Sequence, residues 1–256
     1  MRTTNAIVIG GSLAGMCAAR VLNDFVDHVT IVERDAYPSA HEFRAGVPQA
    51  RHVHNLLARG LRKFEGFFPG FEQRMRHHGA VAVETGWDVA TMSPGGWSQR
   101  YHTGLWQIFA RRPLIESTVL EFCRRLHKVT ILERTEVTAL RAADDGRHYC
   151  NGVEVRSRDD GQTRTLDADL VVDASGAHSR AAEWLPAVGA GVARGRSRRW
   201  PQRLQFALVQ PTSGSSLAAR LVVESDGPAD GNTATSIRNC FLPDRESALA
   251  AQLCRR

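Results

Sequence analysis

Short apolar runs separated by glycine-containing turns dominate the N-terminal part of this chain of 256 residues. The first run, Ala6–Ile9, and the second, Val29–Val32, have the length of buried strands. Between them lie a glycine turn and residues expected to form a helix, and Glu33 closes the second run. The pattern therefore predicts a strand, a tight turn, a helix and a second, parallel strand.

Further along the chain, the spacing of apolar residues alternates between helical and strand-like. It predicts helices over Val53–Phe68, up to Gly79, and from Pro113 onward, because proline suits a first helical turn. Strands are expected at Ala80–Val83, Trp87–Met92, Val129–Leu132, Glu136–Leu140, Tyr149–Arg158, Thr163–Leu166 and Leu170–Val172. A βαβ opening followed by mixed helices and strands places the chain in the α/β class.

The composition of the chain changes near residue 187. Beyond Pro186, Gly, Ala, Ser and Arg dominate, and only three segments keep a pattern capable of regular structure: Leu204–Val209, Leu217–Val223 and Ser247–Leu253. We therefore expect one domain over residues 1–186 and a divergent, incomplete or irregular C-terminal segment over residues 187–256.

The formal net charge of +6 is concentrated in the C-terminal segment. Residues 1–187 carry 23 basic and 22 acidic side chains, whereas residues 188–256 carry 10 arginines and 5 acids. The run Arg194–Arg199 could contact a phosphate backbone. No aromatic interleaving or nucleic-acid motif accompanies it, which favours a solvated basic segment. We expect no nucleic-acid partner.

Five scattered cysteines, none in C-x-x-C spacing, argue against a disulfide framework or a zinc site and favour a cytoplasmic location. No apolar run reaches the roughly 18 residues of a membrane span, and the N-terminus lacks the layout of a signal peptide. His52 and His54 would point to opposite faces of a helix, and no carboxylate cluster accompanies His77 and His78. We expect no metal site.

The turn after the first strand has the spacing of a dinucleotide-binding loop. Gly10 permits the sharp turn, the small Ser12 lets the backbone approach a pyrophosphate, and Gly15 lets the helix pack closely on the sheet. The helix N-terminus offers unpaired N–H groups to phosphates. Glu33 lies near the spacing, roughly 20 residues, of an acid that binds a ribose hydroxyl. Ser12 replaces the middle glycine of the pattern, and its hydroxyl could donate to the pyrophosphate.

Three further segments follow this loop in a fixed order: Arg44–His54 (RAGVPQARHVH), Phe109–Ile115 (FARRPLI) and Ala168–Arg180 (ADLVVDASGAHSR). Together with the loop, they resemble the FAD-dependent monooxygenases of the aromatic-hydroxylase type, whose fold related reductases and halogenases share. The resemblance covers about residues 5–186. It implies a Rossmann-like FAD-binding domain (GR2-type) with a βαβ start and an inserted β-rich segment.

The resemblance also implies a set of cofactor-binding residues. Arg112 would reach the flavin side of FAD, with Arg111 as the neighbouring candidate, and Arg44 or Arg51 could neutralise pyrophosphate charge. Asp173 belongs to a second fingerprint near FAD and the nicotinamide nucleotide, although Ser175 stands where many members have an acid. The full set expected to bind the cofactor is Gly10, Gly11, Ser12, Leu13, Ala14, Gly15, Glu33, Arg34, Arg51, Arg112 and Asp173.

Several of these side chains also have a simpler structural interpretation. Arg112 could pair with Glu116 one turn along the helix, a contact of about 0.2–0.5 kcal/mol. The turn at Asp173 could merely reverse the chain and cap the following helix, and Arg51 could be a surface charge. Three tryptophans could line a substrate cavity, with ordinary packing as the alternative: Trp87, Trp97 and Trp106.

By resemblance, the function is that of an FAD-dependent oxidoreductase, a monooxygenase that uses NAD(P)H and oxygen on an aromatic or polyketide-like small molecule. The cofactor carries the difficult step in such enzymes, so no catalytic side chain is singled out. The family's third fingerprint, a Gly-Asp pair followed by proline and glycines, is missing after Pro186, and we expect weak flavin retention. A truncated, inactive FAD-binding fragment and a flavin-dependent reductase or halogenase-like relative stay open as alternatives.

Overall fold

The computed structural model describes residues 3–39, 42–44, 53–93, 95–142, 150–176 and 179–189, and the strands within 204–241. The chain forms two compact units, which are described separately here. The first unit comprises Met1–Arg51, Lys63–His78 and Arg112–Arg196, and the second comprises His52–Arg62, Gly79–Arg111 and Ser197–Arg256. Segments of the two units therefore alternate along the sequence. The division into two domains at one boundary near residue 187, expected from the sequence, stays a prediction.

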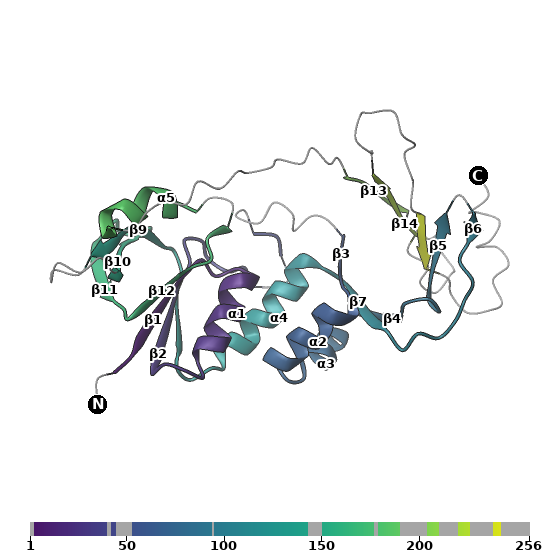
Figure 1. Cartoon of the computed structure of the whole chain (residues 1–256), viewed down its shortest axis with the longest axis horizontal. Coiled ribbons are helices and arrows are strands. Elements are labelled where there is room, and N and C mark those ends of the chain that lie inside the picture. Colours follow the sequence, from purple (N-terminus) through teal and green to yellow (C-terminus); the bar gives the residue numbers. More distant parts are fainter. Residues whose placement is uncertain are drawn as a thin grey trace. The chain divides into compact units, whose positions relative to one another are not determined.

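A four-stranded parallel sheet forms the centre of the first unit, with the strand order β12-β1-β2-β8 (Figure 1). Its strands are β1 (Asn5–Ile9), β2 (His28–Val32), β8 (Val129–Leu132) and β12 (Leu170–Asp173). The α/β class and the βαβ opening predicted from the sequence are confirmed. Within the described residues, β12 pairs with a strand on one side only.

Helices α1 (Leu13–Leu22) and α4 (Arg112–Arg124) pack against each other and against this sheet. Both bury their apolar stripe, with Met16, Ala19 and Val119 fully inaccessible to solvent. The helix α3 (Phe71–His77) packs on α4. Pro113 lies in the first turn of α4, where its missing N–H leaves no hydrogen bond unmade.

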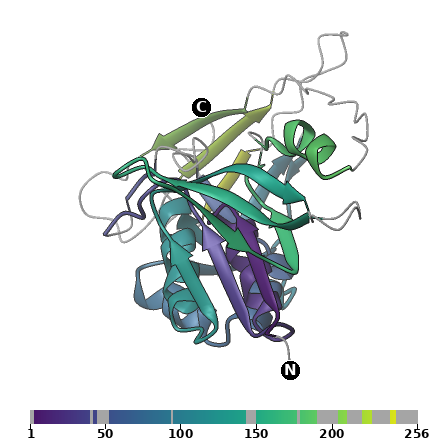
Figure 2. The same cartoon turned by 90° about the vertical axis from the view of Figure 1, so that its left-hand side faces the viewer.

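A three-stranded antiparallel sheet, in the order β11-β10-β9, packs on the parallel sheet through a shared core (Figure 2). Its strands β9 (Thr135–Ala142), β10 (Cys150–Ser157) and β11 (Thr163–Asp167) lie between β8 and β12 in the sequence, as the inserted β-rich segment was predicted to do. The shared core consists of Ile7, Ile9, Val32, Val137, Val153, Val155, Ala168 and Trp184. The helix α5 (Ala181–Trp184) and the 3-10 helix η3 (Leu185–Val188) follow β12.

The second unit contains two antiparallel sheets. One has the order β3-β7-β4, with β3 (Val53–Leu56), β4 (Val81–Glu84) and β7 (Trp106–Arg111). The other has the order β13-β14-β15-β5-β6, with β5 (Val89–Ser93), β6 (Gly96–Trp97), β13 (Leu204–Val209), β14 (Arg220–Ser225) and β15 (Arg238–Phe241). Among the described residues, no helix is long and apolar enough to cross a membrane.

Two sequence-based assignments differ from the structure. The helix predicted over Val53–Phe68 is wrong at its start, because the first four residues form β3 and pair with β7, and only Ala58–Phe67 forms the helix α2. Strand β7 itself was not predicted. Of the C-terminal segments, Leu204–Val209 is a strand as expected, and Ser247–Leu253 lies outside the described residues.

The contact between α1 and β1 leads to a test of the fold. A Cβ on Gly15 would overlap the carbonyl oxygen of Gly10 and approach Val8 Cγ1 to 3.3 Å. We expect Gly15→Ala to lower the free energy of unfolding by about 3 kcal/mol, measured by urea denaturation, because the helix must move off the strand.

The matched control is Gly66→Ala in helix α2, where an added Cβ has no heavy atom within 4 Å. Alanine should stabilise this helical position by up to about 1 kcal/mol. Equal effects of the two substitutions would contradict close packing at Gly15.

Candidate functional site

The turn between β1 and α1 lies at the carboxyl edge of the parallel sheet, where ligands bind in open α/β sheets. Gly10 has a φ of +95°, and a Cβ there would lie 2.7 Å from the carbonyl oxygen of Ala174 in the turn after β12. Its N–H donates to the carbonyl oxygen of Val32 (2.9 Å). Because Gly10 lies where the ends of β1, β2 and β12 come together, only glycine fits at this position.

Ser12 is the residue that precedes helix α1, with extended backbone angles and no hydrogen bond from its side chain to the helix. The first N–H groups of a helix, here those of Leu13, Ala14 and Gly15, have no intrahelical partner. The helix dipole adds partial positive charge at the same place. The loop therefore presents free N–H donors and a positive field at this edge of the sheet, and the binding of a phosphate there stays a prediction.

Glu33 is held in one orientation beneath this loop. Its Oε2 accepts a hydrogen bond from the Gly11 N–H (2.7 Å), and its Oε1 accepts one from the Asp35 N–H (3.0 Å). The residue is 5% exposed and lines the cavity described below. Arg34, the next residue, lines the same cavity and keeps half of its side chain exposed.

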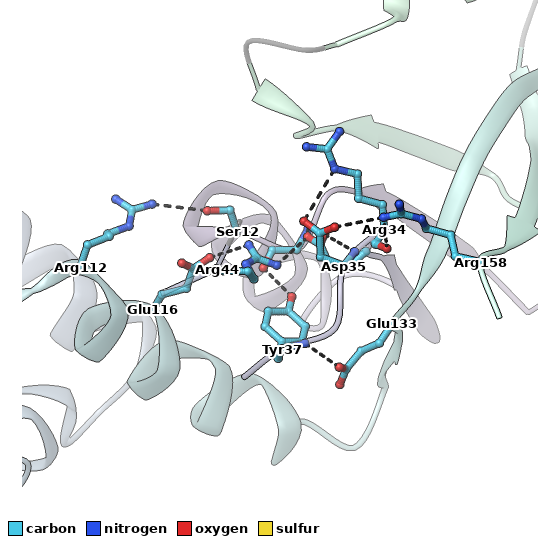
Figure 3. Close-up of polar contacts among 11 residues, drawn as sticks. Ser12, Arg34, Asp35, Tyr37, Arg44, Arg112, Glu116, Glu133 and Arg158 are labelled. Carbon is cyan, nitrogen blue, oxygen red and sulfur yellow. Dashed lines mark hydrogen bonds and ion pairs between the residues drawn. The ribbon is translucent and has the colours of Figure 1, made fainter. Parts of the chain in front are cut away.

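Arg44 lies between the buried carboxylates of Glu33 and Glu116. Figure 3 shows it beside Glu116 and Tyr37. Its guanidinium is 3.1 Å from Glu33 Oε2 and donates to Glu116 Oε1 (2.8 Å), and all three side chains are 7% exposed. Burial alone would lower the pKa of Arg44, but Glu33 and Glu116 outweigh it and raise that pKa. The charge of Arg44 is therefore already compensated, unlike that of a free pyrophosphate-binding arginine.

Tyr37 connects Arg44 to the glycine loop. Its hydroxyl donates to the carbonyl oxygen of Gly11 (2.5 Å), and the Arg44 guanidinium lies 4.9 Å from the centre of its ring. Burial, reinforced by the negative charge of Glu33, raises the pKa of Tyr37, which keeps the hydroxyl a donor. A Cβ on Gly11 would overlap this hydroxyl.

Arg112, the first residue of α4, makes no ion pair with a described residue, although Arg44 also has two buried nitrogen atoms, Nε and Nη1, without a hydrogen-bond partner. The Nε of Arg112 is buried without a hydrogen-bond partner in the described part of the chain, and its Nη2 lies 3.4 Å from Ser12 Oγ (Figure 3). Burial lowers the pKa of Arg112; the charge of Glu116 opposes this, and the charge of Arg44 adds to it. The alternative pairing with Glu116 is not observed, because that carboxylate binds Arg44.

The second fingerprint forms a hydrogen-bonded turn after β12. The Asp173 carboxylate accepts hydrogen bonds from the Ser175 N–H (2.9 Å), the Ser175 hydroxyl (2.5 Å) and the Ser179 hydroxyl. Burial would raise the pKa of Asp173, but these donors outweigh it and lower that pKa. Asp173 thus shapes its own turn, while the residue that precedes α5 is Arg180.

These elements enclose a cavity of about 120 Å³. The loop, Glu33 and the turn after β12 line one part of it, and the antiparallel sheet and α5 contribute the rest. The lining residues that sequence reasoning missed are Thr135, Glu136, Val137, Arg180 and Trp184. Arg180 ends the segment Ala168–Arg180 that carries the resemblance, whereas no local motif marks the other four, which come from the inserted sheet and a short helix.

The other residues that the sequence analysis considered do not line this cavity. Arg51 and His52 lie outside the described residues, and Arg111 belongs to β7 in the second unit. Trp97 and Trp106 are 40% and 45% exposed. No three potential metal ligands gather among the described residues.

Comparison with known proteins gives the following similarities. The sequence model of the FAD binding domain family matches residues 3–198. Protein Rv3254 of Mycobacterium tuberculosis is 35% identical over 201 residues, which are 71% of this chain and 40% of that protein. The chain thus spans about two fifths of the length of this curated relative.

Two solved structures share the fold. Pseudomonas aeruginosa PqsL in complex with 2-aminobenzoylacetate has a TM-score of 0.57 and 16% identity, covering 94% of this chain and 61% of that one. The flavin-dependent monooxygenase PieE in complex with FAD and substrate has a TM-score of 0.51 and 18% identity. The match covers 99% of this chain and 46% of the PieE chain.

The buried charges around Arg44 provide a test of the site. Arg44→Met leaves Glu33 and Glu116 buried without a counter-charge, and we expect the free energy of unfolding to fall by about 3–5 kcal/mol. The control is Arg125→Met, which removes an arginine that is 62% exposed and paired with Glu121 along one helix. This substitution should lower the free energy of unfolding by less than about 0.5 kcal/mol.

Urea denaturation of the two variants measures both values. A loss of stability in Arg44→Met no larger than in Arg125→Met would show that the three buried groups do not depend on one another. Adding Glu116→Gln to Arg44→Met should restore part of the loss, because one uncompensated charge is then removed.

Proposed function

The chain belongs to the FAD binding domain family, and from this premise we propose that it is the cofactor-binding part of an FAD-dependent monooxygenase. We propose NAD(P)H as the electron donor and an aromatic or polyketide-like small molecule as the substrate. One observation supports the proposal most strongly. The glycine loop, the N-terminus of α1 and Arg112, whose Nε has no hydrogen-bond partner among the described residues, lie at the same edge of the parallel sheet.

The residues present fit FAD. Gly10 and Gly11 leave no room for a Cβ, because Ala174 and Tyr37 pack against them, and this close packing fixes the path of the loop that would receive a pyrophosphate. Ser12, Leu13 and Ala14 would hold its phosphates with backbone N–H groups, and Gly15 keeps the helix directed at them. Arg112 supplies a planar guanidinium whose Nε has no other partner among the described residues.

Glu33 would receive the adenosine ribose. Its Oε2 is already engaged by the Gly11 N–H and by Arg44, whereas its Oε1 accepts one hydrogen bond, from the Asp35 N–H. A carboxylate oxygen can accept a second donor, so a ribose hydroxyl can bind Oε1 from the cavity. Arg34 and Asp173 border the same space, and Arg51 stays a proposed contact.

When bound, FAD supplies the redox chemistry that oxygen insertion needs. The described side chains bind and orient the cofactor and keep water out. No side chain of the first unit is required to form a covalent bond.

The substrate class is supported by the relatives. PqsL is described with 2-aminobenzoylacetate and PieE with FAD and substrate. We propose by analogy that this chain also serves a small aromatic molecule. The free cysteines Cys17, Cys123 and Cys150 support the proposed cytoplasmic location, where thiols stay reduced.

A second candidate function is an FAD-binding fragment without activity. It is favoured by the pairing of β12 with a strand on one side only within the described part of the sheet. Two measurements on the purified chain separate the candidates. The visible spectrum after addition of FAD reports binding, and NAD(P)H oxidation with oxygen consumption reports activity.

The role of Arg112 can be tested by FAD titration, followed by flavin fluorescence. Arg112→Met should weaken FAD binding about tenfold to a hundredfold, because a charge-assisted hydrogen bond contributes roughly 1.5–3 kcal/mol. Arg111→Met, the neighbouring candidate, should change the dissociation constant by less than about twofold. An equal loss of FAD affinity in both variants would show that Arg112 has no specific role in binding FAD.

A further inference from the structure

The first unit contains a second pocket, which is larger than the cavity beside the glycine loop. Its volume is about 270 Å³, compared with about 120 Å³ for that cavity. Two residues, Ile9 and Trp184, line both spaces. Every residue that lines the second pocket belongs to the first unit, so its walls are defined without reference to the rest of the chain.

Apolar side chains from three places in the fold form most of the wall. Strand β12 contributes Leu170 and Val171, β9 contributes Leu140, and η3 contributes Val188. The 3-10 helix η3 also contacts β9, and Figure 1 shows α5 beside the antiparallel sheet. Such a lining favours an apolar ligand, because apolar surface of both partners is removed from water when the ligand binds.

An irregularity in β10 places the thiol of Cys150 in this wall. Between Cys150 and Gly152 the register with β9 shifts, so that β10 has one residue more than the strand it pairs with. Side chains alternate between the two faces of a strand, and an extra residue reverses this alternation. Cys150 therefore lies on the same face as Leu140. Its thiol donates to the carbonyl oxygen of Gly152 (3.1 Å), and its small size leaves the pocket open.

Trp184 brings an unpaired hydrogen-bond donor to the pocket. The residue is 7% exposed, and its Nε1 is buried without a partner among the described residues. A buried donor without a partner is unfavourable, and the N–H of a buried tryptophan usually has one. Because Trp184 lines the pocket, an acceptor atom of a bound molecule would supply this partner. The unpaired N–H favours a ligand that carries a carbonyl oxygen.

Two carboxylates give the pocket a negative rim. Asp169 and Asp173 lie at the two ends of the run Leu170–Val172, and both are exposed residues that line the pocket. Hydrogen bonds from Ser175 and Ser179 keep Asp173 ionised. No lysine, arginine or histidine is among the described residues that line this pocket. An anionic ligand would therefore be repelled.

We propose that this pocket binds a small, uncharged aromatic molecule with a carbonyl group, whose oxygen accepts a hydrogen bond from Trp184 Nε1. An engineered apolar cavity of about 150 Å³ binds benzene, so the larger pocket has room for a ring and a short carbonyl side chain. The inference goes beyond the proposed function, because neither the glycine loop nor Arg112 lines this pocket.

Three ligands of nearly equal size test the proposal, each titrated into the full chain without FAD and followed by ligand-detected NMR. Acetophenone is neutral and has a carbonyl oxygen, ethylbenzene is neutral and has none, and benzoate is an anion. Acetophenone should bind to the wild-type chain. Benzoate should bind at least about tenfold more weakly, because its charge meets Asp169 and Asp173.

A pair of substitutions on α5 locates the binding site. Ala181→Leu places a larger side chain in the pocket and should weaken acetophenone binding at least about tenfold. The matched control is Ala182→Leu, at an exposed neighbouring position that does not line the pocket. This control should change the dissociation constant by less than about twofold. Circular dichroism checks that both variants fold as the wild type does.

Trp184→Phe tests the hydrogen bond, because it keeps an aromatic ring and removes the N–H. Acetophenone should bind about threefold to tenfold more weakly to this variant. Ethylbenzene, which has no acceptor, should lose less than about twofold, whereas a general disturbance of the pocket would weaken both ligands equally. That equal loss would overturn the proposed hydrogen bond. A wild-type chain that does not bind acetophenone, or acetophenone binding that Ala181→Leu leaves unchanged, would overturn the site itself.

Discussion

The close contact between Gly15 and Gly10 is the constraint on which the site depends. Because Gly15 has no side chain, helix α1 lies directly on the end of β1 and on Val8. This approach fixes the direction of the helix, and with it the direction of the free N–H groups in its first turn. The turn at Gly10 then fits between β2 and the turn after β12. Any residue larger than glycine at either position would move the anion-binding end of the helix.

The two arginines near this loop, Arg44 and Arg112, both have buried nitrogen atoms but differ in their partners. Arg44 is neutralised by Glu33 and Glu116 and contacts the glycine loop through Tyr37, so it holds the loop and the Glu33 carboxylate in place. Arg112 makes no ion pair with a described residue, and its Nε is buried without a hydrogen-bond partner, as are Nε and Nη1 of Arg44. A buried donor without a partner is unfavourable unless a ligand supplies one. The two arginines therefore differ in the carboxylates around Arg44, and not in the presence of unpaired buried donors.

Much of the first unit could be predicted because its motifs depend on residue type and spacing. Gly10, Gly15 and Glu33 occupy positions that only these residues satisfy, and the strand at Val129–Leu132 was placed correctly by its apolar pattern. Tyr37 and Glu116 could not be assigned, since they meet across a long stretch of sequence. Strand β3 was read as helix because four residues contain too little periodicity, and pairing with β7 decides their conformation.

Two of the buried carboxylates, Glu33 and Glu84, have different kinds of partner. Glu33 accepts a backbone N–H from the glycine loop and an arginine, so its negative charge is compensated inside the first unit. Glu84 accepts two backbone N–H groups and an imidazole, and a backbone N–H carries no net charge. Glu84 therefore ties the segment Tyr101–Gly104 to the end of β4, mostly through neutral donors. The two carboxylates differ in partner because Glu33 meets a buried guanidinium, whereas Glu84 meets backbone N–H groups and the imidazole of His102, which is 65% exposed.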